Sequence, residues 1–307
     1  MKVAIQFFGH IRTFDECFES VKKHLIDIYD CDVFMHTWDK TDHESKTWHK
    51  AKRIIKSVDS QTIQQLKKDY NLKELIVESQ ELDNNREIVS CQHNYGETQI
   101  SINGLRYMLY SQAKVNNLRK NYQNKHNIKY DFIVFIRPDV KLNSDFILDE
   151  LNHAINMQGN NPARYCACNL TSKEFPIIGS CASDVIFVGK PKDIDKSIET
   201  LNHIEFTKNK NKIWSPECLF NQQLKQAGIS SIFINYIYGR DWEIIRPQEN
   251  TKIKKITIRK KIIRLKISKR EFNLHLFSFV SRPILAVQFS ILNMFYVNLL
   301  VGSKRNG

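Results

Sequence analysis

Short apolar runs alternate with stretches of helical periodicity along the first 250 residues. The apolar runs have the length of buried strands and lie at 2–8, 31–37, 75–78, 130–136, 184–189 and 231–238. Apolar residues at three- and four-residue intervals predict helices over 14–28, 60–70, 98–124 and 144–157. This order predicts an α/β domain with a mixed, mostly parallel, Rossmann-like sheet flanked by helices.

Two local signals predict helix starts in this domain. Thr13 and Glu16 have the spacing of a capping box, and Ser215-Pro216-Glu217 places a serine N-cap before a first-turn proline. Residues 83–97 have the composition of a loop.

Charge divides the chain at about residue 250. The formal charge of the protein is +13, and residues 251–307 hold thirteen Lys and Arg against one acid, Glu271. The tail therefore carries +12 and the first 250 residues only +1. We expect a catalytic domain over 1–250 and a separate tail over 251–307, to which any electrostatic partner belongs.

The tail pattern favours a membrane surface as its partner. Residues 252–270 interleave isoleucines with ten positive charges, which predicts a basic amphipathic helix on anionic inner-leaflet lipid. Residues 283–301 are apolar but number only nineteen and include polar side chains, so attachment in the membrane plane is favoured over a packed helix or a true span. No nucleic-acid recognition module accompanies the basic run, and nucleic acid is not expected as a partner.

Composition places the domain among ordinary globular proteins. Apolar residues make up 42% and charged residues 26% of the chain, and the seven cysteines are odd in number and scattered. Reduced thiols and the lack of a secretory pattern after Met1 predict a cytoplasmic protein, peripheral on the inner membrane.

The strand at 130–136 stops abruptly at Arg137-Pro138-Asp139. In open α/β sheets, ligands bind in the crevice beyond the carboxyl ends of the strands. Carboxylate oxygen there suits Mg²⁺ or Mn²⁺, and such a cation stabilises a phosphate leaving group. The alternative for Asp139 is a turn residue that accepts from backbone amides.

Several segments together resemble bacterial nucleotide-diphospho-sugar glycosyltransferases of the GT-A fold, of the kind found in capsule and lipopolysaccharide assembly. These segments span residues 3 to about 240 and read Phe8-Gly9-His10-Ile11-Arg12-Thr13-Phe14, Cys31 through Asp39, Tyr110-Ser111-Gln112-Ala113-Lys114, Tyr130 through Asp139, Ser183 through Phe187, and Pro216-Glu217.

The resemblance implies a glycosyltransferase of the hexosyltransferase type, with a nucleotide-sugar donor and a saccharide or lipid-linked acceptor. It gives Asp139 the metal role of an Asp-x-Asp motif. Arg137 stands where that motif has its first Asp, so metal use stays open. A guanidinium there suits a phosphate, and it also suits an ion pair with a neighbouring Asp.

Further donor-binding candidates lie at the expected sheet edge. Gly9 and Arg12 follow the first strand, where a glycine allows close backbone approach. Trp38 ends the second strand, and it suits either stacking on a base or sugar or packing in the core. The remaining donor-side candidates are Lys114, on the helix before the Asp139 strand, and Arg240.

Two carboxylates from the second half of the domain are candidates for the base that deprotonates the acceptor. These are Asp184 and Glu217. Glu217 also fits a first-turn position stabilised by the helix dipole. Two other classes stay open: a sugar-1-phosphate nucleotidyltransferase, although a glycine-rich phosphate loop is missing, and a non-catalytic membrane-peripheral or nucleic-acid-binding protein.

Overall fold

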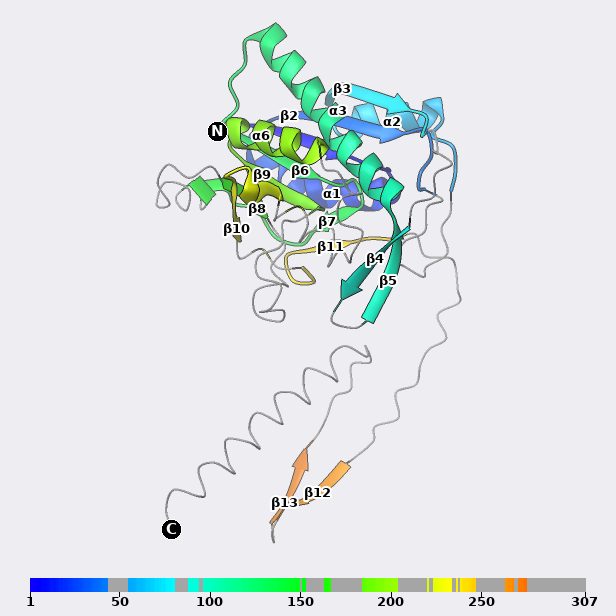
Figure 1. Ribbon diagram of the computed structural model, residues 1–307, viewed down its shortest axis with the longest axis vertical. Helices are drawn as coiled ribbons and strands as arrows, with labels where there is room; N and C mark the ends of the chain where they lie inside the picture. The colour runs from blue at the N-terminus through cyan, green and yellow to red at the C-terminus, as the bar shows by residue number, and fades with distance from the viewer. Residues whose placement is uncertain are drawn as a thin grey trace. The chain divides into compact units, whose positions relative to one another are not determined.

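The computed structural model describes most of the chain up to residue 246 and one hairpin beyond it (Figure 1). The described residues are 1–43, 55–80, 88–93, 96–149, 151–152, 163–166, 184–203, 220, 223–233, 236, 238–246, 263–267 and 270–274. The chain divides into two compact units, Met1–Glu249 and Asn250–Gly307.

A seven-stranded sheet forms the centre of the first unit. Its strand order is β10 (Ser230–Phe233), β8 (Ala163–Cys166), β9 (Ile186–Gly189), β6 (Phe132–Ile136), β1 (Lys2–Phe8), β2 (Asp30–Trp38), β3 (Leu72–Glu78). β9 is antiparallel to both of its neighbours, and the other four pairs are parallel. This is the mixed, mostly parallel sheet that the sequence predicts.

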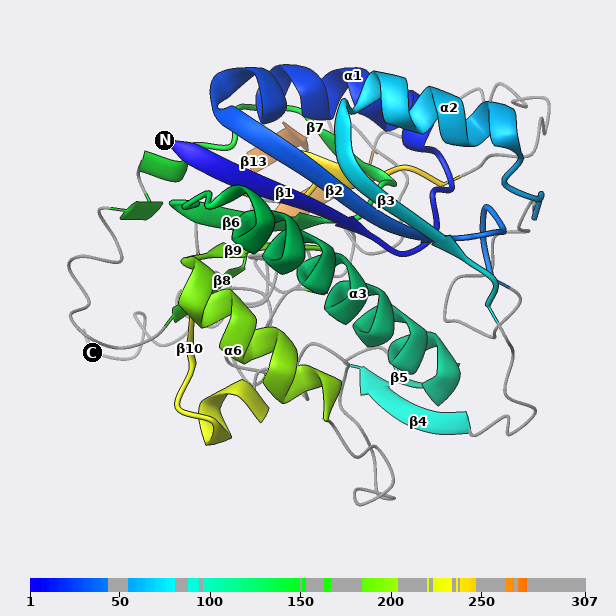
Figure 2. The same ribbon diagram turned by 90° about the horizontal axis from the view of Figure 1, so that it is seen from above.

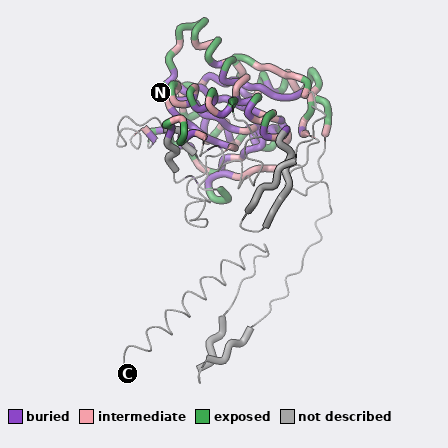
Figure 3. The backbone as a smooth tube through the Cα atoms, viewed as in Figure 1, coloured by how far each residue is buried: buried purple, intermediate pink, exposed green. Residues whose placement is uncertain are grey.

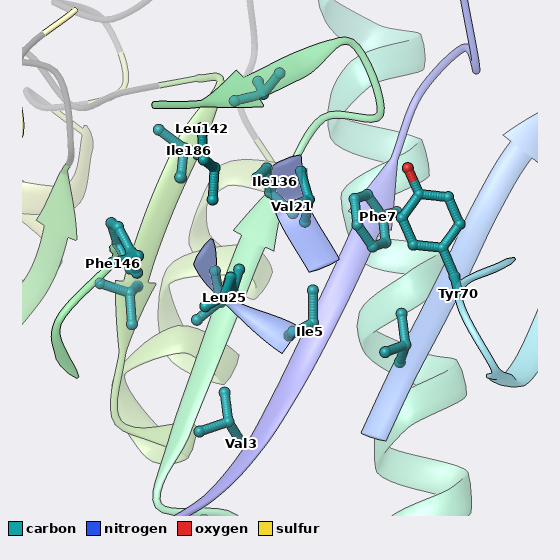
Figure 4. Close-up of a cluster of buried hydrophobic side chains, with 14 of the residues drawn as sticks. Val3, Ile5, Phe7, Val21, Leu25, Tyr70, Ile136, Leu142, Phe146 and Ile186 are labelled. Atoms are coloured by element: carbon teal, nitrogen blue, oxygen red, sulfur yellow. The ribbon is translucent and has the colours of Figure 1, made fainter. Parts of the chain in front are cut away.

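Helices cover both faces of the sheet (Figure 2). On one face lie α1 (Phe14–His24), followed by the short 3-10 turn Ile26–Ile28, and α2 (Ser60–Asp69); on the other lie α3 (Ile102–His126) and α6 (Pro191–Asn202). Alternation along β1 explains why both faces are apolar, because successive strand residues point to opposite sides. The central strands are buried (Figure 3). Ile5 and Phe7 join the core under α1 (Figure 4), whereas Ala4 and Phe8 join the core under α3.

Three two-stranded antiparallel sheets complete the described part of the chain. They pair β4 (Ile88–His93) with β5 (Gly96–Ser101), β7 (Val140–Leu142) with β11 (Trp242–Ile244), and β12 (Ile263–Ile267) with β13 (Arg270–Leu274). The prediction of a loop over 83–97 is therefore wrong over the β4 and β5 residues. Residues 144–147 are also not helical, so the predicted helix over 144–157 starts later than expected.

The basic helix predicted over 252–270 is wrong where the structure describes it. Residues 263–267 read Ile-Arg-Leu-Lys-Ile, which alternates with the period of two that suits a strand, and they pair antiparallel with 270–274. Apolar positions are matched across this pair, since Ile263 lies opposite Leu274 and Leu265 opposite Phe272.

The predicted capping box at the start of α1 is also wrong. Thr13 makes no side-chain cap hydrogen bond. Its hydroxyl instead donates to the carbonyl of Ile245 at 2.9 Å, 232 residues along the chain. A long-range hydrogen bond thus takes the place of the expected local cap.

We predict that Phe187→Ala lowers the free energy of unfolding by about 3–5 kcal/mol, as expected for truncating a buried aromatic ring. Phe187 is fully buried and stacks on Phe135 with ring centroids 4.7 Å apart. Urea denaturation measures the change. Ile28→Ala, at a residue 37% exposed, is the control and should cost far less; equal losses would contradict this account of the core.

Candidate functional site

The carboxyl ends of β6, β1, β2 and β3 meet at one edge of the sheet. Phe8 pairs with His36, and Phe7 pairs with Ile136, so Gly9 and Arg137 follow neighbouring strands at the same level. This parallel register brings together loops that are more than a hundred residues apart in sequence.

Three arginines surround the carboxylate of Asp139, which is fully buried. Arg137 donates twice, from Nε to Oδ1 at 2.9 Å and from Nη2 to Oδ2 at 2.5 Å. Oδ2 also accepts from Nη1 of Arg12 at 3.0 Å and from Nη1 of Arg246 at 2.5 Å. We call Arg12, Arg137 and Arg246 the arginine cluster.

Each member of the arginine cluster comes from a different segment. Arg137 directly follows β6, and Arg12 comes from the loop after β1. Pairing of β7 with β11 carries Arg246 to the same place, because the amide of Ile245 donates to the carbonyl of Asp139 at 2.9 Å. The hydroxyl of Thr13 donates to the carbonyl of Ile245 and so also fixes this residue.

Arg12 has an unusual backbone conformation. Its φ is 41°, in the left-handed region that non-glycine residues rarely adopt. Its amide donates to the carbonyl of Thr41 at 3.0 Å, and its Nε donates to Asp42 at 2.9 Å. Gly9, at the start of this loop, has φ 88°, and a Cβ there would meet nothing within 4 Å. Glycine therefore provides a positive φ at this position, and not the close backbone approach that was expected from the sequence.

Interactions between charges and burial determine the pKa values of this cluster. Burial by itself would raise the pKa of Asp139, but Arg137, Arg12 and Arg246 together hold it well below its usual value. Burial and then repulsion from Arg137 lower the pKa of Arg246 to about 10. Asp139 is therefore ionised and Arg246 is positively charged at neutral pH.

A divalent cation does not fit at Asp139. Its Oδ2 already accepts from three guanidinium groups, and a metal at this carboxylate would stand among three positive charges. Within the described ranges, no group of three or more His, Cys, Asp or Glu side chains is arranged to hold a metal ion. In this structure Asp139 accepts from arginines, which differs from the arrangement that the predicted metal role requires.

A second polar network joins the ends of β1, β2 and β3. Nε2 of the buried His36 lies 3.4 Å from the carboxylate of Glu78, which can only accept, so Nε2 carries the proton. Nδ1 of His36 then accepts from the hydroxyl of Ser111 at 2.7 Å, and Ser111 accepts from the amide of Gly9 at 2.7 Å. Ser111 is fully buried, so this chain of bonds fixes the Gly9 loop and does not present a nucleophile.

Trp38 and Lys114 belong to the surroundings of that network. Trp38 is 3% exposed and stacks on Tyr110 with ring centroids 5.7 Å apart. It therefore packs in the core, which was the alternative to stacking on a ligand. Lys114 donates to Glu78 at 2.9 Å and lies over the Tyr110 ring. The exposed aromatic ring at this edge is Tyr110, at 39%.

The other candidates from the sequence have fewer contacts with the arginine cluster. Asp184 precedes β9, and its negative charge acts on Arg137, whose amide donates to Val185. Arg240 pairs with its neighbour Asp241 at 2.6 Å and has 55% of its side chain exposed. Glu217 lies outside the described residues.

Sequence reasoning missed Arg246 and Asp42. A signal for Arg246 was present, because Ile245-Arg246-Pro247 repeats the Ile136-Arg137-Pro138 sequence. Nothing local marks Asp42, which becomes buried only when its loop meets Arg12.

Solved structures are similar to this chain. No family model matches the chain, and no curated protein matches it. One of the similar structures is a mannosyltransferase from Pyrobaculum calidifontis in complex with GDP-mannose and Mn²⁺, with a TM-score of 0.40 and 7% sequence identity. The match covers 77% of this chain and 55% of that chain.

We predict that the free energy of unfolding falls as the pH is lowered from 6.5 to 4. Burial is the main reason that the pKa values of His10 and His36 lie at about 4 rather than 6.5. Below pH 6.5 the unfolded chain therefore binds protons at these histidines that the folded protein does not bind. This difference lowers the free energy of unfolding by up to roughly 3 kcal/mol per histidine. Urea denaturation at several pH values measures the slope.

His36→Gln should reduce that slope below pH 6.5. Near pH 8 His10 and His36 are neutral in both states, so the variant should there differ from the wild type by a constant offset. Equal slopes for the two proteins between pH 6.5 and 4 would contradict the account of His36.

Proposed function

We propose that this chain is a glycosyltransferase that moves a sugar from a nucleotide-sugar donor to a saccharide or lipid-linked acceptor in the assembly of bacterial cell-surface polysaccharide. The sequence resemblance to capsule and lipopolysaccharide enzymes of the GT-A fold motivates the reaction class. The Rossmann-like sheet supplies the edge at which such donors bind.

The observation that carries the proposal is the meeting of Arg12 and Arg137 at that edge. They follow adjacent parallel strands, and both guanidinium groups are fixed by Asp139. Paired guanidinium groups are suited to a diphosphate, which is the anionic part of a nucleotide-sugar. The hydrogen-bond network from Gly9 to Glu78 holds the loop that carries Arg12.

Asp184 is our candidate for the base on the acceptor side. It precedes β9, whose residue Ile186 pairs with Ile136, directly before Arg137. It is only partly buried, and its charge acts on Arg137. A carboxylate beside the leaving-group site can take the proton of an acceptor hydroxyl.

The tail is proposed to hold the enzyme at the anionic cytoplasmic face of the inner membrane. Its charge of +12 is the supporting observation. In the part of the chain that the structure describes, no helix has both the length and the apolar character needed to cross a membrane.

We predict that the purified protein releases a nucleoside diphosphate or monophosphate from a subset of nucleotide-sugars, and transfers the sugar when acceptor is present. Donors are found first by the rise in melting temperature on binding. Asp184→Asn should lower transfer roughly 10²- to 10⁴-fold, the usual contribution of a general base, while donor binding is retained.

Glu199→Gln, at an exposed acid on α6, is the matched control and should transfer at the wild-type rate. Normal transfer by Asp184→Asn would remove Asp184 from the mechanism. Synthesis of a nucleotide-sugar from a nucleoside triphosphate and a sugar phosphate would instead identify a nucleotidyltransferase.

We predict that the full-length protein binds vesicles containing anionic phospholipid through its tail. Replacing five tail lysines by glutamine should weaken binding at least a hundredfold, since each charge near the surface contributes about 1 kcal/mol. Vesicle sedimentation measures this for Lys252, Lys254, Lys255, Lys260 and Lys261.

The control replaces five exposed lysines of the first unit by glutamine, namely Lys67, Lys68, Lys120, Lys125 and Lys129. That variant has the same net charge as the tail variant and should bind vesicles like the wild type. Equal weakening by both sets would show a general charge effect and refute a tail-specific site.

A further inference from the structure

We propose that the arginine cluster binds the diphosphate of the donor without a metal ion, and that Asp139 is a positioning residue that holds the three guanidinium groups in place. The inference rests on the proposed function and deepens it. It replaces the metal that the sequence resemblance implies with positive charge supplied by the chain.

The first support is the charge of the cluster. Three guanidinium groups share the carboxylate of Asp139, and Arg12 also pairs with Asp42. Asp184 adds a further negative charge near Arg137. Repulsion among the arginines persists nonetheless, since Arg137 and Arg12 both disfavour the charged form of Arg246. An added anion would relieve that repulsion.

The second support is the hydrogen-bonding capacity that remains. Arg12 uses Nε and Nη1 on Asp42 and Asp139, and Arg137 uses Nε and Nη2 on Asp139. A guanidinium group has five N–H donors, so these two arginines each have one entire terminal nitrogen left, Nη2 on Arg12 and Nη1 on Arg137. No acceptor for either nitrogen lies within the described part of the chain.

The three arginine side chains are more exposed than the carboxylate that they hold. The side chains of Arg12 and Arg137 keep 11% and 12% of their surface exposed, and that of Arg246 keeps 25%, whereas Asp139 keeps none. The carboxylate thus lies behind the guanidinium groups. A ligand that reaches the cluster meets positive charge and N–H donors before it meets Asp139.

The third support is backbone strain at Arg12. A non-glycine residue at φ 41° costs of order 1 kcal/mol or more, and such strain gathers at functional sites. Here it is maintained by the bond from the Arg12 amide to Thr41 and by the Gly9–Ser111 bond earlier in the same loop. The loop is held in the one conformation that directs Arg12 to Asp139.

The cluster suits the leaving group of the transfer. As an acceptor oxygen bonds to the anomeric carbon, the bond from that carbon to the phosphate oxygen breaks, and its electron pair goes to the departing diphosphate. The acceptor proton goes to Asp184. Fixed guanidinium groups stabilise the new negative charge without reorganising, which is the work that a metal ion otherwise performs.

Inorganic pyrophosphate tests this inference by calorimetry in the presence of EDTA, because it carries the diphosphate charge without a sugar or base. We expect the full chain to bind it, with an affinity that Mg²⁺ changes by less than about threefold. Arg246→Gln should weaken binding at least tenfold, and Arg246→Lys should recover only part of that loss because lysine lacks the planar fork.

Lys120→Gln, on the exposed side of α3, removes the same charge elsewhere and should bind like the wild type. Asp139→Asn should also weaken binding, since the guanidinium groups lose their common ionic acceptor. Melting temperatures identify any variant that fails to fold. If Arg246→Gln fails to fold, the loss of affinity in Arg246→Lys still tests the inference.

Two results would overturn the inference: pyrophosphate binding that requires Mg²⁺, or unchanged affinity in folded Arg246→Gln. The proposed function fails separately. Metal-free pyrophosphate binding with no turnover of any nucleotide-sugar would support the anion site and refute the transferase. Turnover that depends on a metal, with the same dependence for pyrophosphate, would support the transferase and refute this site.

Discussion

The ion cluster of Asp139 with three arginines organises the carboxyl edge of the sheet. A buried carboxylate without cations would be strongly disfavoured, and three close guanidinium groups without an anion would repel one another. Each side of the cluster therefore makes the other possible. Because Arg12, Arg137 and Arg246 belong to separate segments, the same contacts join the loop after β1, the end of β6 and the end of β11.

This arrangement couples the fold to the site. The β7–β11 pairing and the bond from Thr13 to Ile245 place Arg246, and the network from Gly9 through Ser111 and His36 to Glu78 places the loop of Arg12. None of these supporting groups needs to touch a ligand. They reduce the freedom of the guanidinium groups before binding, which lowers the entropy lost when an anion arrives.

Elements with a strong apolar period could be predicted from the sequence, and those defined by distant partners could not. β1 spans the predicted residues because both faces of that strand are buried, which gives an uninterrupted apolar run. The local signal at Thr13 failed because a carbonyl 232 residues away competes for its hydroxyl. α6 was missed although Pro191 and the apolar positions Ile194, Ile198 and Leu201 have helical spacing.

The role of Asp139 shows where sequence reasoning about a site stops. Arg137-Pro138-Asp139 located the sheet edge correctly, but a carboxylate suits a metal or an arginine equally well until its neighbours are known. The deciding neighbour, Arg246, lies 107 residues along the chain and is brought there by a three-residue strand. Its Ile-Arg-Pro sequence matches that of Arg137, so the same three residues occur at the end of β6 and directly after β11, and both arginines donate to one oxygen of Asp139. The role that we propose for Asp139 is to hold these converging donors, so that the remaining terminal nitrogens of Arg12 and Arg137 face a ligand at this edge.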